Sequence, residues 1–172
     1  LAGGAARPIL ESTPVADWSP DGSELAVIRL ANGKSRVEYP IGRVLYETPL
    51  FLSLLRVSPD GTRVAFVEYE AQESGVVTVV DTKGARRALS RPYYRPRGLA
   101  WRPDGEEVWF TPMGSEGATS VLAVTLAGRE RVVHRFPGWT NLQDISRQGR
   151  LLVARENVFM PIVGARAGEN LR

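Results

Sequence analysis

The 172-residue sequence contains no cysteine, a single histidine and no long apolar run. Without cysteine the chain forms neither disulfides nor thiolate metal sites, although this does not fix its cellular compartment. A lone histidine, His134, in an alternating strand indicates a surface or packing residue rather than a metal ligand or catalyst. No stretch approaches the ~20 apolar residues of a membrane-spanning helix. We therefore expect no metal site, no cofactor and no membrane span in this chain.

Motifs of familiar catalytic sites are also missing. The segment Gly114–Gly117 has the wrong spacing for the G-x-S-x-G pattern of serine hydrolases, and no phosphate-binding glycine loop or kinase motif occurs. Carboxylate pairs of the glycosidase type stay open, because Asp and Glu from distant segments can meet in space. We expect no catalytic residue in this chain and predict a non-enzymatic protein.

The net charge is only +3, because the chain has 22 Lys and Arg and 19 Asp and Glu. The exception to this balance is the segment 86–102, which holds six arginines, three aromatic residues and no acid. One interpretation is an anion or nucleic-acid patch, because arginine pairs with phosphate and aromatic rings stack on bases. We favour a solvated strand and loop whose arginines pair with acids elsewhere, so nucleic acid is not the expected partner. The candidate contacts for a ligand or partner are Arg86, Arg87, Arg91, Tyr93, Tyr94, Arg95 and Arg97.

Turn residues, by contrast, are abundant and repeat. The tetrapeptide Ser-Pro-Asp-Gly occurs at Ser19–Gly22 and Ser58–Gly61, with a close variant at Arg102–Gly105 and a more divergent variant at Ser146–Gly149. The units that contain them begin at residues 15, 54, 98 and 142. A fixed period of about 40 residues is typical of a repeat architecture, in which each unit needs its neighbours to bury a core.

Each copy of the tetrapeptide predicts a hairpin between two strands. Proline suits the second position of a type I turn, aspartate tolerates the third and can bond the backbone locally, and glycine adopts the left-handed conformation at the fourth. We therefore assign a structural role to the turn residues Pro20, Asp21, Gly22, Pro59, Asp60, Gly61, Pro103, Asp104 and Gly105. Apolar residues flank each turn: Trp18, Val57, Trp101 and Ile145 precede it, and Leu25, Val64, Val108 and Leu152 follow it.

The strand after each turn is apolar on both faces, as at residues 25–28, 64–67 and 151–154. A strand covered on both sides has this pattern, and the stacked sheets of a β-propeller supply the cover. Third strands are expected at 36–39, 76–80, 120–125 and 160–164, and outer strands at 43–46, 87–89 and 131–134. The sequence thus predicts an all-β propeller of about four antiparallel four-stranded blades.

The order of the strands leaves the closure of the ring open. We place one domain at 1–172, with blades near 15–47, 54–91, 98–136 and 142–172, and an outer strand at 5–11 donated from the N-terminus. The chain forms either a complete four-bladed ring or a fragment of a larger one, and Leu1 in place of an initiator Met favours a fragment. In a fragment, open blade edges predict self-association, and two copies would make an eight-bladed ring.

The tryptophans fall into two groups. Trp18 and Trp101 occupy equivalent positions in their units, and we expect both to be packing anchors between blades. Trp139 lies in the polar loop at 137–141, where packing is favoured but exposure also makes it a candidate for ligand contact.

These units resemble the TolB-like, or PD40, class of WD40-related propeller repeats. The resemblance covers nearly the whole chain and weakens only at Arg147 and Gln148. More particularly, residues 36–48 and 144–156 resemble the C-terminal propeller region of bacterial serine/threonine protein kinases, whose catalytic domain lies upstream. The resemblance implies a binding or sensing module for a protein or peptide, within a larger signalling protein. The alternatives are an accessory propeller of a serine peptidase or other hydrolase, with catalysis outside this chain, and a structural oligomerisation module.

Overall fold

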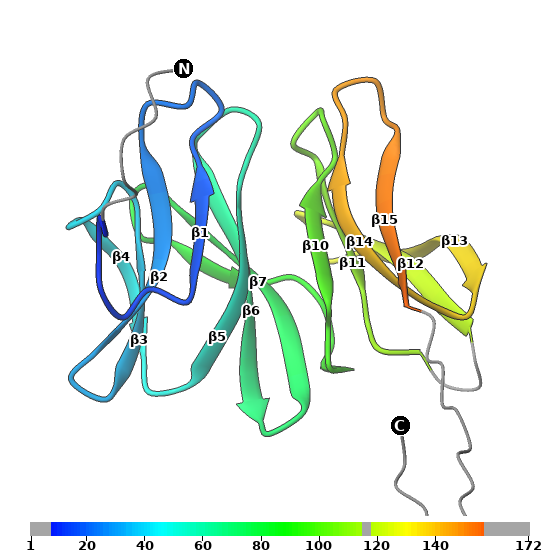
Figure 1. The fold of residues 1–172 in the computed structure, drawn as a ribbon, viewed down its shortest axis with the longest axis horizontal. Coiled ribbons are helices and arrows are strands. Elements are labelled where there is room, and N and C mark those ends of the chain that lie inside the picture. The colour runs from blue at the N-terminus through cyan, green and yellow to red at the C-terminus, as the bar shows by residue number, and fades with distance from the viewer. Residues whose placement is uncertain (1–7, 115–117, 157–172) are drawn as a thin grey trace, which may run out of the picture.

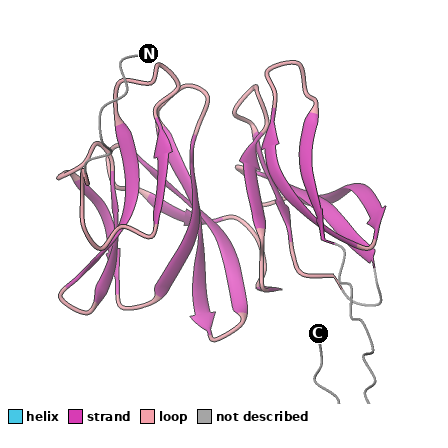
Figure 2. Cartoon of the chain, viewed as in Figure 1, coloured by secondary structure: helices cyan, strands magenta, loops and turns pink. Residues whose placement is uncertain are grey.

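The computed structural model describes residues 8–114 and 118–156, which form strands and loops only (Figure 2). The strands group into antiparallel sheets that follow the repeat units in chain order. The first sheet contains β1 (Val15–Trp18), β2 (Leu25–Ala31), β3 (Lys34–Glu38) and β4 (Val44–Thr48). The second contains β5 (Phe51–Val57), β6 (Arg63–Ala71), β7 (Ser74–Asp81) and β8 (Arg86–Ala88), with β9 (Tyr93–Tyr94) paired to β7.

The third and fourth sheets continue the series. The third contains β10 (Gly98–Trp101), β11 (Glu107–Thr111), β12 (Ala118–Thr125) and β13 (Glu130–Pro137), and the fourth contains β14 (Trp139–Ile145) and β15 (Leu151–Glu156). We call these sheets blades 1 to 4. The predicted all-β propeller architecture is confirmed: within the described residues, blades 1 and 3 have four strands, blade 2 has four strands and the added β9, and blade 4 has two strands.

The blades stack face to face. The first strands of successive blades lie side by side, β1 against β5, β5 against β10 and β10 against β14 (Figure 1). One apolar cluster fills each gap between blades: Ile28 and Phe66 lie in the first, Ala65 and Trp101 in the second, and Val121 and Ile145 in the third. Each blade therefore completes its core with side chains from its neighbours, as the repeat pattern requires.

Blades 3 and 4 lie close together at Gly98. A Cβ atom built there would lie 2.3 Å from the Leu142 carbonyl oxygen and 2.5 Å from Thr111 Oγ1. No side chain fits at that separation, so the start of β10 needs glycine for β14 to pack against it.

The turns formed by the repeated tetrapeptide have the predicted geometry. In the first, the Gly22 N–H donates to the Ser19 carbonyl at 2.8 Å and Gly22 has a φ of 73°. The Ser19 hydroxyl donates to Asp21 Oδ1 at 2.5 Å, and the Ser23 N–H donates to the same oxygen at 3.1 Å. Asp60 accepts the corresponding bonds in the second turn. In the third, Arg102 replaces the serine and forms an ion pair with Asp104 at 3.3 Å.

This turn predicts an acid-sensitive contribution to stability. Hydrogen bonds from the Ser19 hydroxyl and from Ser23 lower the pKa of Asp21 from 3.8 to about 2. Because the folded value lies below the unfolded value, the contribution is complete above 3.8 and is lost as the pH falls through about 2. Carboxyl titration by NMR should give a value near 2, and Asp21→Asn should flatten the dependence of thermal stability on pH in this window. An ordinary pKa at Asp21 would contradict the turn geometry.

The fourth turn differs from the other three in length. It is one residue shorter, since the Ser146 N–H donates to the Arg150 carbonyl, whereas the Ser19 N–H donates to the Glu24 carbonyl five residues on. Ile145 therefore pairs with Leu151 and not with Leu152. Leu152 points to the opposite face of β15, where it is 61% exposed.

Trp18 also differs from its prediction. Trp101 is 5% exposed and its indole Nε1–H donates to the Arg56 carbonyl of blade 2 at 3.0 Å. Trp18 occupies the same position in blade 1 but is 58% exposed, so it is not a packing anchor between described blades. The reason is its place in the series: its face of blade 1 is turned away from blade 2, and the described residues form no blade on that side.

The strands predicted at the two ends have different outcomes. The outer strand expected at 5–11 is not formed at residues 8–11, which pair with no described strand, while residues 5–7 lie outside the described residues. The strand expected at 160–164 also lies outside them. The short strand β9 was not predicted, because Tyr93 and Tyr94 stand in the arginine-rich segment that we assigned to an outer strand and a loop.

Candidate ligand pocket

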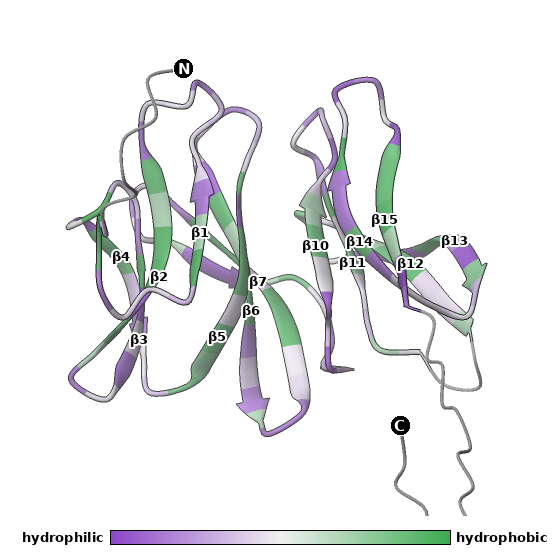
Figure 3. Ribbon diagram, in the orientation of Figure 1, coloured by the Kyte–Doolittle hydropathy of each residue, from purple (hydrophilic) through white to green (hydrophobic). Residues whose placement is uncertain are grey.

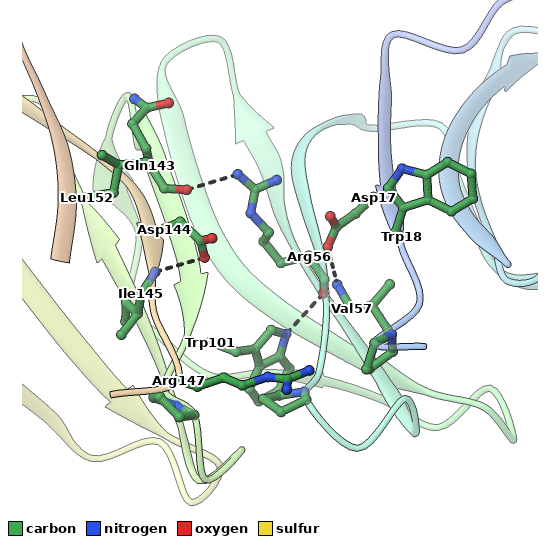
Figure 4. Close-up of a pocket in the computed structure, with 13 residues that line it drawn as sticks. Asp17, Trp18, Arg56, Val57, Trp101, Gln143, Asp144, Ile145, Arg147 and Leu152 are labelled. Carbon is green, nitrogen blue, oxygen red and sulfur yellow. Dashed lines mark hydrogen bonds between the residues drawn. The ribbon is translucent and has the colours of Figure 1, made fainter. Parts of the chain in front are cut away.

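A cavity lies at the centre of the blade series. It has a volume of about 800 Å³ and is bordered by the ends of the four first strands and by the turns that follow them (Figure 4). Three equivalent positions of each unit contribute most of its wall. The last strand residues Trp18, Val57, Trp101 and Ile145 line it, with the turn residues Pro20, Pro59, Pro103 and Arg147 beside them.

The third set of equivalent positions carries the charge. Asp17, Arg56 and Asp144 line the cavity from β1, β5 and β14, and the corresponding residue in β10 is the buried Ala100. Blade 4 adds a second cation, because Arg147 replaces the proline of the other turns. The pocket is therefore built by a repeat whose polar positions differ from unit to unit.

Asp17 is held by the neighbouring blade. The Val57 backbone N–H donates to Asp17 Oδ2 at 2.9 Å. Burial raises the pKa of the Asp17 carboxyl above its ordinary 3.8, against the opposing effect of the Val57 hydrogen bond. The carboxylate is thus fixed in position and partly desolvated.

Arg56 crosses the pocket from blade 2 to blade 4. Its Nη2 donates to the Gln143 carbonyl at 3.1 Å and its Nη1 to the Leu55 carbonyl at 3.1 Å. Two neutral carbonyls thus orient the half-buried guanidinium, and no carboxylate among the described residues forms an ion pair with it. Because a guanidinium carries five N–H donors, others remain for a ligand.

Asp144 and Arg147 complete the polar wall on blade 4. Asp144 Oδ1 accepts a hydrogen bond from the adjacent Ile145 N–H at 2.8 Å, and both Asp144 and Arg147 are exposed. The pocket balances two guanidinium groups against two carboxylates between walls of tryptophan, proline and aliphatic side chains. This arrangement can donate hydrogen bonds to a carbonyl and accept them from an N–H of the same ligand.

The arginine-rich segment does not form a free basic patch. Five of its six arginines pair with acids: Arg86 with Glu68, Arg91 with Glu130, Arg95 with Glu73, Arg97 with Glu156, and Arg102 with Asp104. Arg91 and Arg95 also stack on Tyr93 and Tyr94. Arg87 is exposed on β8. Most of the positive charge is therefore neutralised locally.

The predicted contact residues do not meet in one place. Trp139 is 39% exposed at the start of β14 and lines a small hollow with Arg97, and Tyr93 lies beside Arg91 in another groove on the outer side of blade 3. None of these residues lines the central pocket. Among residues 8–114 and 118–156, no group of three or more His, Asp or Glu side chains could hold a metal ion, and no helix could cross a membrane.

Sequence reasoning missed Asp17, Arg56, Asp144 and Arg147. A signal was present, because these residues are the variable members of otherwise similar units: each stands beside an apolar residue and a turn that recur. Positions that vary inside a constant scaffold are where a repeat protein places its binding surface.

Comparisons with known proteins agree with this geometry. No protein-family model matches the sequence, and no curated protein sequence matches it. Among solved structures, a putative TolB from Agrobacterium tumefaciens superimposes with a TM-score of 0.55 at 18% identity, over 82% of this chain and 56% of that one. The fold is that of a TolB-like β-propeller. TolB from Acinetobacter baumannii gives a TM-score of 0.52 at 13% identity, over 78% of this chain and 33% of that one.

This chain also superimposes on part of a much longer chain. A prolyl endopeptidase structure gives a TM-score of 0.60 at 21% identity, over 83% of this chain and 26% of that one. The chain therefore spans about a quarter to just over half the length of these structures. At such identities the similarity concerns the fold, and the activities of the longer proteins do not transfer with it.

Proposed function

We propose that this TolB-like propeller is a non-enzymatic binding module that holds a protein or peptide segment in its central pocket, as part of a larger bacterial, kinase-linked signalling protein. The central pocket carries the proposal. Four blades converge on one cavity, and its polar side chains come from the positions that vary between units. Binding residues on loops and strand ends above a rigid scaffold are the usual arrangement in propellers.

A peptide suits the chemistry of the pocket. A backbone amide offers a carbonyl to the free N–H groups of Arg56 and an N–H to a carboxylate of the pocket wall. The apolar walls provide area for side chains, and the balance of two cations and two anions favours a ligand without strong net charge. The resemblance of residues 36–48 and 144–156 to kinase-linked propellers supports the signalling context.

A second candidate is an accessory propeller of a serine peptidase or another hydrolase, with catalysis outside this chain. The similarity to part of a prolyl endopeptidase structure supports it. Generic esterase, peptidase and glycosidase substrates separate the chain itself from an enzyme. We expect no turnover, and turnover that survives repurification would overturn the non-enzymatic role.

The binding role is tested with a phage-displayed library of random peptides selected on the 172-residue protein. Peptides enriched on the wild type should bind about tenfold or more weakly to Arg56→Ala or Arg147→Ala, because each substitution removes a charged donor from the pocket. Affinity is measured by titration calorimetry with the enriched peptides.

The matched control is Arg87→Ala, which removes an exposed arginine outside the pocket and should leave affinity unchanged. Equal losses in all three variants would show that binding depends on overall charge. Failure of the library to yield any peptide sensitive to the pocket variants would contradict the proposed site.

A further inference from the structure

Within residues 8–114 and 118–156, the two end blades each have one face that no described strand covers. On blade 1 this face carries Trp18, which is 58% exposed, and on blade 4 it carries Leu152, which is 61% exposed. Both side chains border the central pocket. Figure 3 shows that β15 is hydrophobic over most of its length although it stands at the end of the blade series. An exposed apolar face of this kind indicates an interaction surface.

The internal gaps between blades show what such a face binds. Two of the three gaps have a hydrogen bond between first strands, and the two bonds differ in their groups: the Asp17 carboxylate accepts the Val57 backbone N–H of the following blade, and the Arg56 backbone carbonyl accepts the indole N–H of Trp101 in the following blade. In both, the residue two before the turn of one blade bonds the residue just before the turn of the next blade. We call this contact the blade joint.

The free faces of this chain contain both halves of a blade joint. Asp144 stands in the position of Asp17 and Arg56, and Trp18 stands in the position of Val57 and Trp101. Asp144 therefore offers a carboxylate and a carbonyl, while Trp18 offers a backbone N–H and an indole N–H. In the described residues Asp144 Oδ1 bonds the adjacent Ile145 N–H, and no partner is found for Oδ2.

The apolar components match as well. Leu152 lies opposite Asp144 in β15, as Ala65 lies opposite Arg56 in β6. Ala65 packs in the same cluster as Trp101. A blade that follows blade 4 would therefore place its own joint tryptophan against Leu152, and blade 1 has that tryptophan.

We propose that two copies of this chain associate head to tail, with Trp18 of each copy docked against Asp144 and Leu152 of the other. The two joints are related by a two-fold axis, so the assembly closes and leaves neither face free. Eight blades then surround one central space. Docking by the same geometry that joins blades within the chain needs no rearrangement of the scaffold.

The experiment is light scattering of the 172-residue protein over a concentration series, which should show twice the 18.9 kDa chain mass. Trp18→Arg and Leu152→Arg should each raise the dimer dissociation constant about thirtyfold or more, because each places a charge in an apolar joint. Val132→Arg, at an exposed valine on β13, is the matched control and should remain dimeric.

Mixing the two variants tests the head-to-tail arrangement. A copy with Trp18→Arg still has a normal Leu152, and a copy with Leu152→Arg still has a normal Trp18, so an equimolar mixture recovers one joint and part of the association. A wild-type chain that stays monomeric at every concentration would overturn the proposal. Dimerisation lost in Trp18→Arg and intact in Leu152→Arg would replace it with a symmetric contact between two blade 1 faces.

A far-UV circular dichroism spectrum and a thermal melt of each variant accompany these measurements. Both substituted side chains are exposed within a single chain, so the variants should keep the fold of the wild-type monomer. Loss of strand signal in a variant would transfer the test to the milder Trp18→Gln and Leu152→Gln, for which the same weakening of the dimer is expected.

Discussion

Trp101→Ala should lower the free energy of unfolding by about 4 kcal/mol, whereas Trp18→Ala should change it by about 0.5 kcal/mol in dilute, monomeric protein. The two tryptophans occupy the same position in their units and differ in whether a neighbouring blade covers them. Trp101 loses its contacts in the apolar cluster and its hydrogen bond to the Arg56 carbonyl. Trp18 loses little because most of its surface already faces solvent.

Urea unfolding of both variants at low protein concentration measures the difference. Each variant is the control for the other, because both replace a tryptophan by alanine at the same position of a repeat unit. Similar losses in the two variants would mean that a single chain covers Trp18, and the account of an uncovered blade 1 face would be wrong.

Arg86→Ala should be the second strongly destabilising change, with a loss of about 3 kcal/mol. Glu68 is 1% exposed in β6, and the Arg86 Nε–H donates to its Oε2 at 3.1 Å, with a further bond from Nη2. The Tyr46 hydroxyl of blade 1 donates to Oε1 at 2.6 Å. Without the guanidinium, a buried carboxylate keeps only the tyrosine as a partner, which is costly in a low-dielectric interior.

The adjacent Arg87→Ala is the control, because Arg87 is exposed and its loss should cost about 0.5 kcal/mol or less. Combining Arg86→Ala with Glu68→Leu should recover much of the loss, since the unpaired charge is then gone. Equal stability of the two single variants, measured by the same urea unfolding, would show that Glu68 does not depend on Arg86.

The repeat made most of the fold predictable. Local chemistry alone fixes the Ser-Pro-Asp-Gly turns, and the strands on either side follow from apolar residues at a constant offset. The strand register does not follow from the repeat where a turn changes length. The turn before β15 is one residue shorter than the others, so Ile145 pairs with Leu151, and an alignment of the units at constant length hides this difference.

Burial was less predictable than strand position. Trp18 and Trp101 have the same local sequence context, so no local pattern distinguishes the covered residue from the uncovered one. The difference depends on the order of blades in space, which is a property of the assembled chain. The same reason explains the exposure of Leu152, because the apolar sequence of its strand predicts cover on both faces.

The polar residues of the pocket were predictable in principle but were missed. Sequence reasoning took its candidate contacts from the arginine-rich segment, although it favoured local pairing with acids there, and five of the six arginines do pair with acids. Asp17, Arg56 and Asp144 are 39 or more residues apart and meet only because the first strand of every blade borders the same cavity. Comparing equivalent positions between units, in place of neighbours along the chain, would have found them.

The central claim is that one chain forms a TolB-like propeller segment whose first blade has a free face. Acrylamide quenching of a variant that keeps only Trp18, with Phe at Trp101, Trp109 and Trp139, tests it most directly. At a dilution where light scattering gives the mass of one chain, the account predicts a readily quenched fluorescence that becomes protected only as copies associate. Fluorescence that is shielded in the monomer would show that the chain closes on itself, and would contradict the claim.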